Sequence, residues 1–243
     1  MNVMPKLGIN IDHVATLRQA RREFDPDPIF AAQICERAGG DSIVAHLRED
    51  RRHINDKDIQ RLKKVVESRF NLEMSIAPEI VRIALGIQPD IATLVPERRQ
   101  EITTEGGLNV VRHFSRIKKT VTALQGKKIM VSLFIAPDKN QITKAFETRA
   151  EAIELHTGHY ANAKEPSTIK QELNKLHQAV IYARSLGLTV NAGHGLNYTN
   201  IKPIAQIPGI EELNIGHAII SQAIFAGLEK AVKDMLKLAR NSK

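Results

Sequence analysis

Short apolar runs rich in β-branched residues recur along the chain at fairly regular intervals. Each run has the length and the composition of a buried β-strand. The runs are LGINID (7–12), SIVAHL (42–47), NLEMSI (71–76), IATLVP (91–96), IMVSLFI (129–135), AIELHT (152–157), TVNAGH (189–194) and ELNIGH (212–217). We expect a strand at each of them.

The stretches between these runs place apolar residues three and four positions apart, as amphipathic helices do. Asp56 opens one such stretch and Pro78 another, and proline is favourable in a first helical turn. A long helix is expected from Ser167 to a stop at Gly187, and a last one from 219 to about 238. The predicted inward faces are Ile59, Leu62, Val65 and Val66; Ile80, Val81, Ala84 and Leu85; and Ile169, Leu173, Leu176, Val180 and Ala183.

Eight alternations of strand and helix favour a parallel sheet, and 243 residues is the size of one (β/α)8 TIM barrel. No low-complexity linker divides the chain, so a single catalytic domain over 1–243 is predicted. A doubly wound open sheet is the alternative. It requires a glycine-rich phosphate turn after the first strand, and NIDHVATL contains no glycine. The pattern therefore favours the barrel.

Polar residues gather at the ends of the predicted strands. Several stand two positions apart, which puts both side chains on one face of a strand: Asn10 and Asp12, His46 and Arg48, Asn71 and Glu73, Glu154 and His156. The last two runs finish in Gly-His, at 193–194 and 216–217. Catalytic groups in this fold come from the carboxyl ends of several strands. We therefore predict an active site at that mouth of the barrel.

These residue types suit repeated proton transfer on phosphorylated compounds. Histidine accepts and donates protons near neutral pH. A carboxyl group in a barrel mouth has its pKa raised by burial or lowered by a nearby arginine, and the sequence leaves both open. Gly193, Gly195 and Gly216 lie in the last two units, whose loops commonly bind phosphate through backbone N–H groups.

Arginines near the first two strands are candidate phosphate ligands, because the guanidinium fork matches phosphate geometry. The loop HLREDRRHINDKD carries Arg48 and His53, and Arg21 follows the first strand by a helical stretch. The arginines at 51 and 52 are expected to be surface partners of the acidic residues at 49 and 50.

The formal net charge of +8 fits three kinds of partner: nucleic acid, an anionic membrane surface, or small phosphorylated molecules. Aromatic residues make up 4% of the chain, tryptophan is absent and basic residues are mixed with acidic ones. This pattern argues against nucleic acid. No apolar run is long enough to span a bilayer, the N-terminus lacks a secretory pattern, and Cys35 is expected to be buried. A cytoplasmic protein without nucleic-acid or membrane partners is predicted.

Two cofactor chemistries find little support in the sequence. His156 and His159 have acids scattered around them, but there is no cysteine cluster and no His-Glu-x-x-His helix, so no metal is expected. No lysine occurs in the predicted strand cores, which argues against a Schiff-base aldolase. The long charged loop 96–108 is a candidate lid over the mouth, with an ordinary surface loop as the alternative.

Seven separated segments carry a resemblance to a known family. They are GINIDHVATLRQARR, AHLREDRRHINDKD, NLEMSI, LVPERRQEITTEGGL, IELHTGHYA, VNAGHGLNY and ELNIGHAII. In this order they resemble the pyridoxine 5′-phosphate synthases of vitamin B6 biosynthesis. The resemblance runs from the first strand to the last helix, and the stretches 109–128 and 160–186 contribute little to it.

The resemblance implies a (β/α)8 barrel with extra helices that assembles as a homo-octamer. It implies a transferase that condenses 3-amino-2-oxopropyl phosphate with 1-deoxy-D-xylulose 5-phosphate, giving pyridoxine 5′-phosphate, phosphate and water. It also implies that the reaction uses neither a metal nor an organic cofactor.

Residue roles follow from the same resemblance, position by position. The implied proton acceptors are His46 and Glu73, the donor is His194, and Glu154 stabilises a transition state. The aminoketone phosphate is expected at Asn10, Arg21, Gly195, Gly216 and His217. The sugar phosphate is expected at Asp12, His13, Arg48, His53 and Thr103.

Two other functions are the alternatives. One is a cofactor-free barrel isomerase or aldolase that acts on a single sugar phosphate. The other is a non-catalytic barrel that binds a phosphorylated metabolite or nucleic acid.

Overall fold

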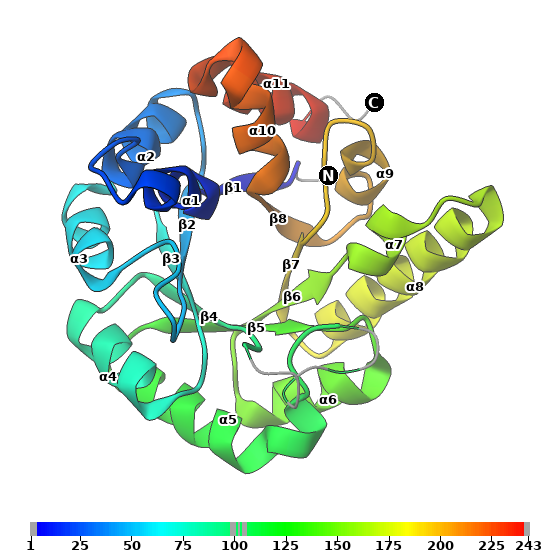
Figure 1. The fold of residues 1–243 in the computed structure, drawn as a ribbon. Helices are drawn as coiled ribbons and strands as arrows, with labels where there is room; N and C mark the ends of the chain where they lie inside the picture. The colour runs from blue at the N-terminus through cyan, green and yellow to red at the C-terminus, as the bar shows by residue number, and fades with distance from the viewer. Residues whose placement is uncertain (1–3, 98–100, 102, 104–105, 241–243) are drawn as a thin grey trace.

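The computed structural model describes residues 4–97, 101, 103 and 106–240. Eight parallel strands form a closed barrel in the order in which they occur along the chain, with β1 paired to both β2 and β8 (Figure 1). The strands are β1 (Lys6–Asn10), β2 (Ser42–Leu47), β3 (Phe70–Met74), β4 (Ile91–Leu94), β5 (Met130–Ile135), β6 (Ala152–His156), β7 (Thr189–Gly193) and β8 (Ile210–Ile215). The predicted TIM barrel is confirmed.

The helices surround the barrel (Figure 1). They are α1 (Asp12–Arg21), α2 (Pro28–Arg37), α3 (Asp56–Val65), α4 (Pro78–Ile87), α5 (Val110–Gln125), α6 (Lys139–Thr148), α7 (Gly158–Asn162), α8 (Pro166–Ser185), α9 (Ile201–Ala205), α10 (His217–Ala226) and α11 (Leu228–Arg240). Three of them, α1, α7 and α10, come between a strand and the next helix, and these are the extra helices of the fold. Within the described residues, every helix is too short or too polar to cross a membrane.

The main hydrophobic core lies between the barrel and the helices. Alternate strand residues point outward, where they pack against the inner faces of the helices. Leu7 and Ile9 of β1 do so, as do Leu72 and Met74 of β3, and all four are fully buried. Cys35 on α2 belongs to the same core, as expected from its helical pattern, and burial raises the pKa of its thiol to about 12.

Many side chains inside the barrel are small or polar. A Cβ atom on Gly8 would lie 2.0 Å from Oδ1 of Asn214 and 2.8 Å from Oγ of Ser42. Asn71 accepts a 2.8 Å hydrogen bond from Thr93 on the neighbouring strand. Bulky aliphatic residues usually fill this space in the fold. The polar interior here continues directly into the polar mouth described below.

Local signals explain most helix boundaries. The Asn55 side chain caps α3 by accepting the backbone N–H groups of Lys57 and Asp58, and the Asp58 carboxylate accepts the backbone N–H of Asn55. Buried Arg18 on α1 makes two 2.7 Å hydrogen bonds to the Asp58 carboxylate. Because a bidentate pair fixes both position and orientation, it holds α1 beside the mouth.

Five predicted boundaries were wrong. Two of them are in the runs 71–76 and 91–96, where the strands end at Met74 and Leu94, two residues before the predicted ends. The runs 7–12 and 212–217 do not remain extended to their ends, because the backbone turns at Ile11 and Gly216. Asp12 and His217 are instead the first residues of α1 and α10. The single helix expected over 219–238 is two helices, α10 and α11, separated by Gly227, whose φ of +80° is incompatible with a continuous helix.

Candidate active site

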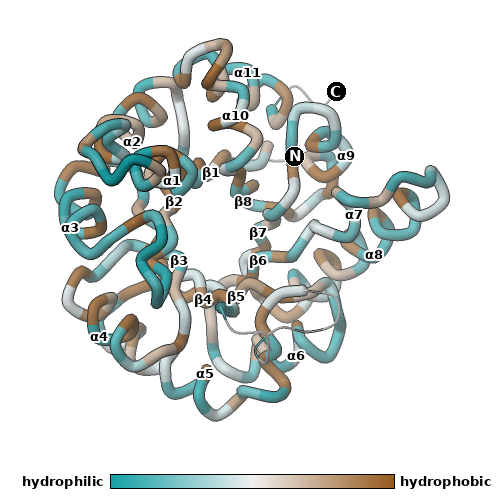
Figure 2. Tube along the Cα trace, in the orientation of Figure 1, coloured by the Kyte–Doolittle hydropathy of each residue, from teal (hydrophilic) through white to brown (hydrophobic). Residues whose placement is uncertain are grey.

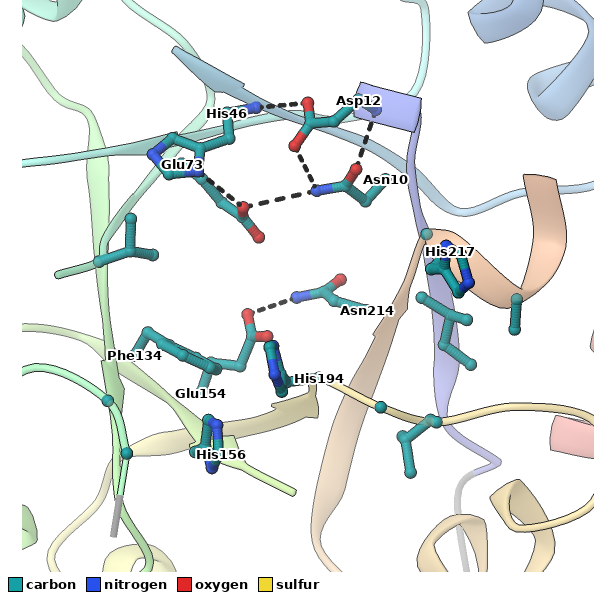
Figure 3. A pocket seen from close by; sticks show the side chains of 18 of the residues that line it. Asn10, Asp12, His46, Glu73, Phe134, Glu154, His156, His194, Asn214 and His217 are labelled. Carbon is teal, nitrogen blue, oxygen red and sulfur yellow. Dashed lines mark hydrogen bonds and ion pairs between the residues drawn. The ribbon is translucent and has the colours of Figure 1, made fainter. Parts of the chain in front are cut away.

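The carboxyl ends of the strands open into a cavity of about 650 Å³. Its walls come from nearly every strand, since parallel strands in a barrel all end at the same mouth (Figure 3). The lining residues are Asn10, Asp12, His13, His46, Glu73, Val95, Pro96, Gly106, Gly107, Phe134, Glu154, His156, His194, Gly195, Leu196, Asn197, Asn214, Ile215, Gly216, His217 and Ala218. Most of the titratable groups predicted from the strand ends therefore share one space.

One wall carries a hydrogen-bonded cluster from β1, β2 and β3 (Figure 3). Asp12 accepts the backbone N–H of His46 at 2.8 Å and the side-chain amide of Asn10 at 3.0 Å. The same amide group of Asn10 donates to Glu73 at 3.4 Å. His46 and Glu73 are register partners on adjacent strands, and His46 Nδ1 lies 3.9 Å from Glu73 Oε2. Strand pairing thus places an imidazole beside a carboxyl group.

Burial controls the protonation of the two acids in this cluster. It raises the pKa of Asp12 to about 6, even though His46, Asn10 and Arg48 lower it. Burial also raises the pKa of Glu73 well above its ordinary value, and the neighbouring Glu154 and Asp12 carboxyls add to the rise. The raised pKa favours the protonated form of Glu73, and such a shift is typical of groups that exchange protons in catalysis.

The opposite wall presents Glu154 on β6. Asn214 on β8 donates a 2.7 Å hydrogen bond to Glu154 Oε2. A Cβ atom on Gly193 would lie 2.2 Å from Glu154 Oε1, so only glycine on β7 leaves room for this carboxyl group. Burial raises the pKa of Glu154 to about 7; the hydrogen bond from Asn214 opposes this rise, and the charge of Glu212 adds to it.

His194 directly follows β7 on a turn with left-handed backbone. Its φ is +82° and that of Gly195 is +85°. The Thr157 hydroxyl lies 2.9 Å from the Gly193 carbonyl and 2.7 Å from the His194 carbonyl, within donating distance of both, which pins the turn to β6. The imidazole stacks on His156 with ring centroids 4.7 Å apart (Figure 3). Burial lowers the pKa of His194, so the ring is neutral at neutral pH.

His156 supports the His194 ring from behind. The backbone N–H of Gly158 donates to His156 Nδ1 at 3.3 Å, and Phe134 packs edge-on at 5.3 Å between centroids. A Cβ atom on Gly158 would lie 2.4 Å from the His156 ring. Burial, together with the nearby His194 and His159 rings, lowers the pKa of His156 to about 4. Because the His156 ring is neutral, His194 can gain a proton without electrostatic repulsion from a second positive charge.

The third part of the cavity is the start of α10. His217 opens this helix. Gly216 precedes it and packs closely against Asn10, because a Cβ atom on Gly216 would lie 2.9 Å from the Cβ atom of Asn10. The His13 and His217 rings meet edge to face at 4.9 Å. Among the described residues no side chain caps the first N–H groups of α10. Free N–H groups at a helix start attract anions such as phosphate.

Comparison with known proteins assigns the family. The model of the family described as pyridoxal phosphate biosynthesis protein PdxJ matches residues 7–241. The chain belongs to the PdxJ family. A pyridoxine 5′-phosphate synthase of Synechococcus sp. (strain JA-2-3B'a(2-13)) is 56% identical over 232 residues, 96% of this chain and 97% of that protein. One of Geotalea daltonii (strain DSM 22248 / JCM 15807 / FRC-32) is 53% identical over 239 residues, 98% and 100% of the two chains.

Solved structures at low identity share the fold. The structure described as native KDPGal has a TM-score of 0.65 and 12% identity, over 100% of this chain and 97% of that chain. KGPDC from Streptococcus mutans has a TM-score of 0.66 and 11% identity, over 98% and 99%. At such identity the likeness supports the barrel architecture of this PdxJ family member and nothing more specific.

The structure brings together most of the site residues predicted for this PdxJ family member. Those that line the cavity are Asn10, Asp12, His13, His46, Glu73, Glu154, His194, Gly195, Gly216 and His217. Four others do not line it, namely Arg21, Arg48, His53 and Thr103.

Three of these four residues form hydrogen bonds with neighbouring residues in their own loops. Arg48 bonds the Asp50 carboxylate, the His53 ring accepts the N–H of Ile54 at 2.8 Å, and the Thr103 hydroxyl donates to the Gly106 carbonyl at 2.6 Å. Arg21 ends α1 and is exposed. Their contribution to phosphate binding stays a prediction.

The two arginines expected on the surface have different partners. Arg52 pairs with Asp50, as predicted. Arg51 bonds the carboxylates of Asp56 and Glu79, and donates to the backbone carbonyl of Glu49. Most of the loop after β2 is strongly hydrophilic (Figure 2).

The candidate lid 96–108 lies partly outside the described residues, at 98–100, 102 and 104–105. Its described ends touch the site. Pro96, Gly106 and Gly107 line the cavity, and Cβ atoms on the two glycines would meet the His156 ring and the Ile135 backbone at 2.7 and 2.8 Å. The idea that the loop closes over the mouth stays a prediction.

Other residues of the site were not given roles from the sequence. Asn214, Phe134 and His156 line the cavity, and Glu97 bonds the His46 ring at 3.1 Å. His156 had a signal, the two-residue spacing from Glu154. Asn214 stands two positions before Gly216 in the last predicted strand, which is a comparable signal. Nothing in the sequence marked Phe134 or Glu97.

A metal is the alternative explanation for the cluster on β1 to β3. Donor atoms of Asp12, His46 and Glu73 lie within 4.8 Å of one another. Both Asp12 oxygens already accept hydrogen bonds, from His46 and from Asn10. A hydrogen-bonded proton-transfer cluster accounts for this proximity without a metal, so the cluster itself gives no reason to invoke one.

Replacing Asn214 by leucine is expected to raise the pKa of Glu154 above about 7. The leucine has a similar shape but cannot donate the hydrogen bond that favours the ionised carboxylate. The pKa is measured by ¹³C NMR of labelled glutamate side chains. Asn71→Leu, which removes another amide from the barrel interior, is the matched control. An unchanged or lower pKa in Asn214→Leu would show that the bond does not tune Glu154.

Proposed function

We propose that the protein is a pyridoxine 5′-phosphate synthase. It condenses 3-amino-2-oxopropyl phosphate with 1-deoxy-D-xylulose 5-phosphate, closing the pyridine ring with release of phosphate and water. The relatives at 53–56% identity carry this name. The single observation that carries the proposal is that His46, Glu73, Glu154 and His194 line one cavity of about 650 Å³.

The arrangement suits a reaction with several proton transfers at different atoms. Imine formation, loss of phosphate, loss of water, ring closure and aromatisation each move a proton, and one acid–base pair reaches few of these positions. Glu73 and His46 act from one wall and His194 from the other, so the substrate between them is served from both sides.

The protonation states set the role of each group. Glu73, whose pKa is raised, and His46 beside it relay protons taken from the substrate. His194 enters the reaction neutral, takes up a proton and later donates it to a leaving oxygen. Glu154 has a pKa of about 7, and in its ionised form it stabilises positive charge on an imine intermediate.

Two phosphorylated substrates require two anion sites. The start of α10, with Gly216, His217 and Gly195, supplies one through backbone N–H groups, and Asn10 lies against it. Arg48, His53 and Thr103, with Asp12 and His13, form the other toward the loop after β2, and Arg21 adds to the aminoketone side. Arg48 would exchange its present partner Asp50 for the phosphate.

The rest of the proposal concerns the protein as a whole. The chain acts as one catalytic domain over 1–243, assembles as a homo-octamer in the cytoplasm, and needs neither metal nor organic cofactor. It is a transferase without nucleic-acid or membrane partners.

Purified protein incubated with both substrates tests the proposal, with pyridoxine 5′-phosphate followed by absorbance and by mass. The synthase forms it only when both substrates are present. A barrel isomerase or aldolase would instead consume the sugar phosphate alone, and a binding protein would consume neither. Either result would refute the proposed function.

Treatment with a chelator is expected to leave the rate of product formation unchanged. Both Asp12 oxygens and Nε2 of His46 already take part in hydrogen bonds, and the protons move between side chains. The rate is measured before and after dialysis against EDTA, with untreated dialysed protein as the control. A loss of rate that a divalent ion restores would contradict the cofactor-free reaction.

A further inference from the structure

A second carboxylate binds the His46 ring on the side away from Glu73. Glu97 lies just beyond β4, and its Oε1 is 3.1 Å from His46 Nε2. The Glu97 side chain is 4% exposed, so water does not compete for this bond. His46 Nδ1, on the other edge of the ring, faces Glu73 Oε2 at 3.9 Å (Figure 3).

Glu97 is held as an ionised hydrogen-bond acceptor. Its second oxygen, Oε2, accepts the backbone N–H of Glu49 at 2.9 Å and lies 3.9 Å from the Arg48 guanidinium. Burial alone would raise the pKa of Glu97, but the bonds and charges of His46, Glu49 and Arg48 outweigh it and lower the pKa. A carboxylate ion can only accept, so the hydrogen in the bond belongs to His46 Nε2.

The two carboxyl groups around His46 therefore have different functions. Glu73 lines the cavity and holds a proton readily, whereas Glu97 does not belong to the lining residues and stays ionised. With Nε2 carrying the hydrogen, the lone pair of His46 is on Nδ1. Nδ1 faces Glu73, which lines the cavity where a substrate would bind.

We propose that Glu97 is a positioning residue, which holds His46 in the Nε2–H tautomer and leaves Nδ1 as the proton-accepting atom. The consequence for catalysis rests on the proposed function, because it takes His46 as a base of that reaction. A buried carboxylate that orients a catalytic imidazole in this way is well established in acyl-transfer enzymes. There too the carboxylate touches neither the substrate nor the transferred proton.

Other charged groups surround His46 and have to be considered with Glu97. They are Asp12 at the start of α1, Arg48 and His53 after β2, and Glu73 on β3. Asp12 bonds the backbone N–H of His46, and the His53 ring is 6.1 Å away between centroids. Among the hydrogen bonds in the described part of the chain, the bond that His46 Nε2 makes to Glu97 involves a ring nitrogen of His46, whereas the bond to Asp12 involves its backbone N–H. It is therefore the bond that selects the tautomer.

The first measurement needs no change at Glu97. In ¹⁵N NMR of histidine-labelled protein, His46 should show a protonated Nε2 and an unprotonated Nδ1, with a His46→Gln variant identifying its signals. A wild-type His46 with the hydrogen on Nδ1 would overturn the proposal. This result does not depend on turnover, so it is separate from failure of the proposed function, which would appear as no product from both substrates.

The second measurement uses Glu97→Gln, which keeps the size of the side chain and one acceptor for the Glu49 N–H. The amide offers its NH2 group to Nε2, so the hydrogen of His46 should move to Nδ1. We expect kcat to fall about 10- to 100-fold with little change in KM. Glu97→Asp, which keeps the charge, should retain the Nε2–H tautomer and more of the rate.

Glu79→Gln is the matched control. Glu79 lies at the same end of the barrel, is 59% exposed and pairs with Arg51, so its loss should change neither kcat nor the His46 signals. A Glu97→Gln enzyme with the wild-type tautomer, or with a kcat like that of Glu79→Gln, would overturn the positioning role.

Discussion

Replacing His194 by alanine is expected to lower kcat about 10²- to 10⁴-fold, the range for loss of a general acid–base group. The imidazole projects into the cavity from a turn that Thr157 pins to β6, and it stacks on the neutral His156 ring. Alanine removes the proton carrier and leaves these supports in place. The measurement is the rate of pyridoxine 5′-phosphate formation with both substrates at saturation.

The turn at His194 decides which control is informative. Its φ of +82° lies in the left-handed region, which asparagine adopts more readily than other residues with a Cβ. His194→Asn should therefore fold at least as well as the alanine variant and be equally inactive. His159→Ala, an exposed histidine on α7, should keep wild-type activity. An active, folded His194→Asn enzyme would show that the ring is not the acid.

Replacing Glu73 by glutamine is expected to lower kcat about 10²- to 10⁴-fold while substrate affinity changes little. Glutamine keeps the shape and the bond with Asn10 but cannot accept or release a proton. Glu147→Gln, an exposed carboxylate on α6, is the control. Unchanged turnover in a folded Glu73→Gln enzyme would refute the acid–base role of this carboxyl group.

The same substitution is expected to stabilise the folded protein, by an amount that depends on pH. Because the pKa of Glu73 in the folded protein is raised well above its ordinary value of 4.5, the unfolded chain loses this proton at lower pH. The wild type therefore loses stability as pH rises above 4.5 toward the folded-state pKa, and the glutamine variant does not. The Tm of Glu73→Gln should exceed that of the wild type increasingly over this range. A Tm difference independent of pH would show that the pKa is not raised.

Much of the fold follows from local patterns in the sequence. The runs from Ser42 and Ala152 are strands close to their expected bounds, and α3, α4 and α8 begin within a residue of the predicted capping or proline position. These features depend on neighbours in the chain, which is why periodicity reveals them. The errors at Asp12, His217 and Gly227 are sharp turns, where a single backbone angle overrides an apolar pattern.

The sequence by itself determined the barrel, the mouth at which the polar groups gather, and most of the residues there. Closure of the barrel decided which of those groups form hydrogen bonds with one another and how their pKa values shift. His46 is bonded to Glu97 and Glu154 to Asn214, pairs separated by 51 and 60 positions along the chain. Burial raises the pKa of Glu73 and Glu154, whereas Glu97 stays ionised. Such contacts and burial arise from strand register and packing in three dimensions, and residue spacing along a strand carries no record of them.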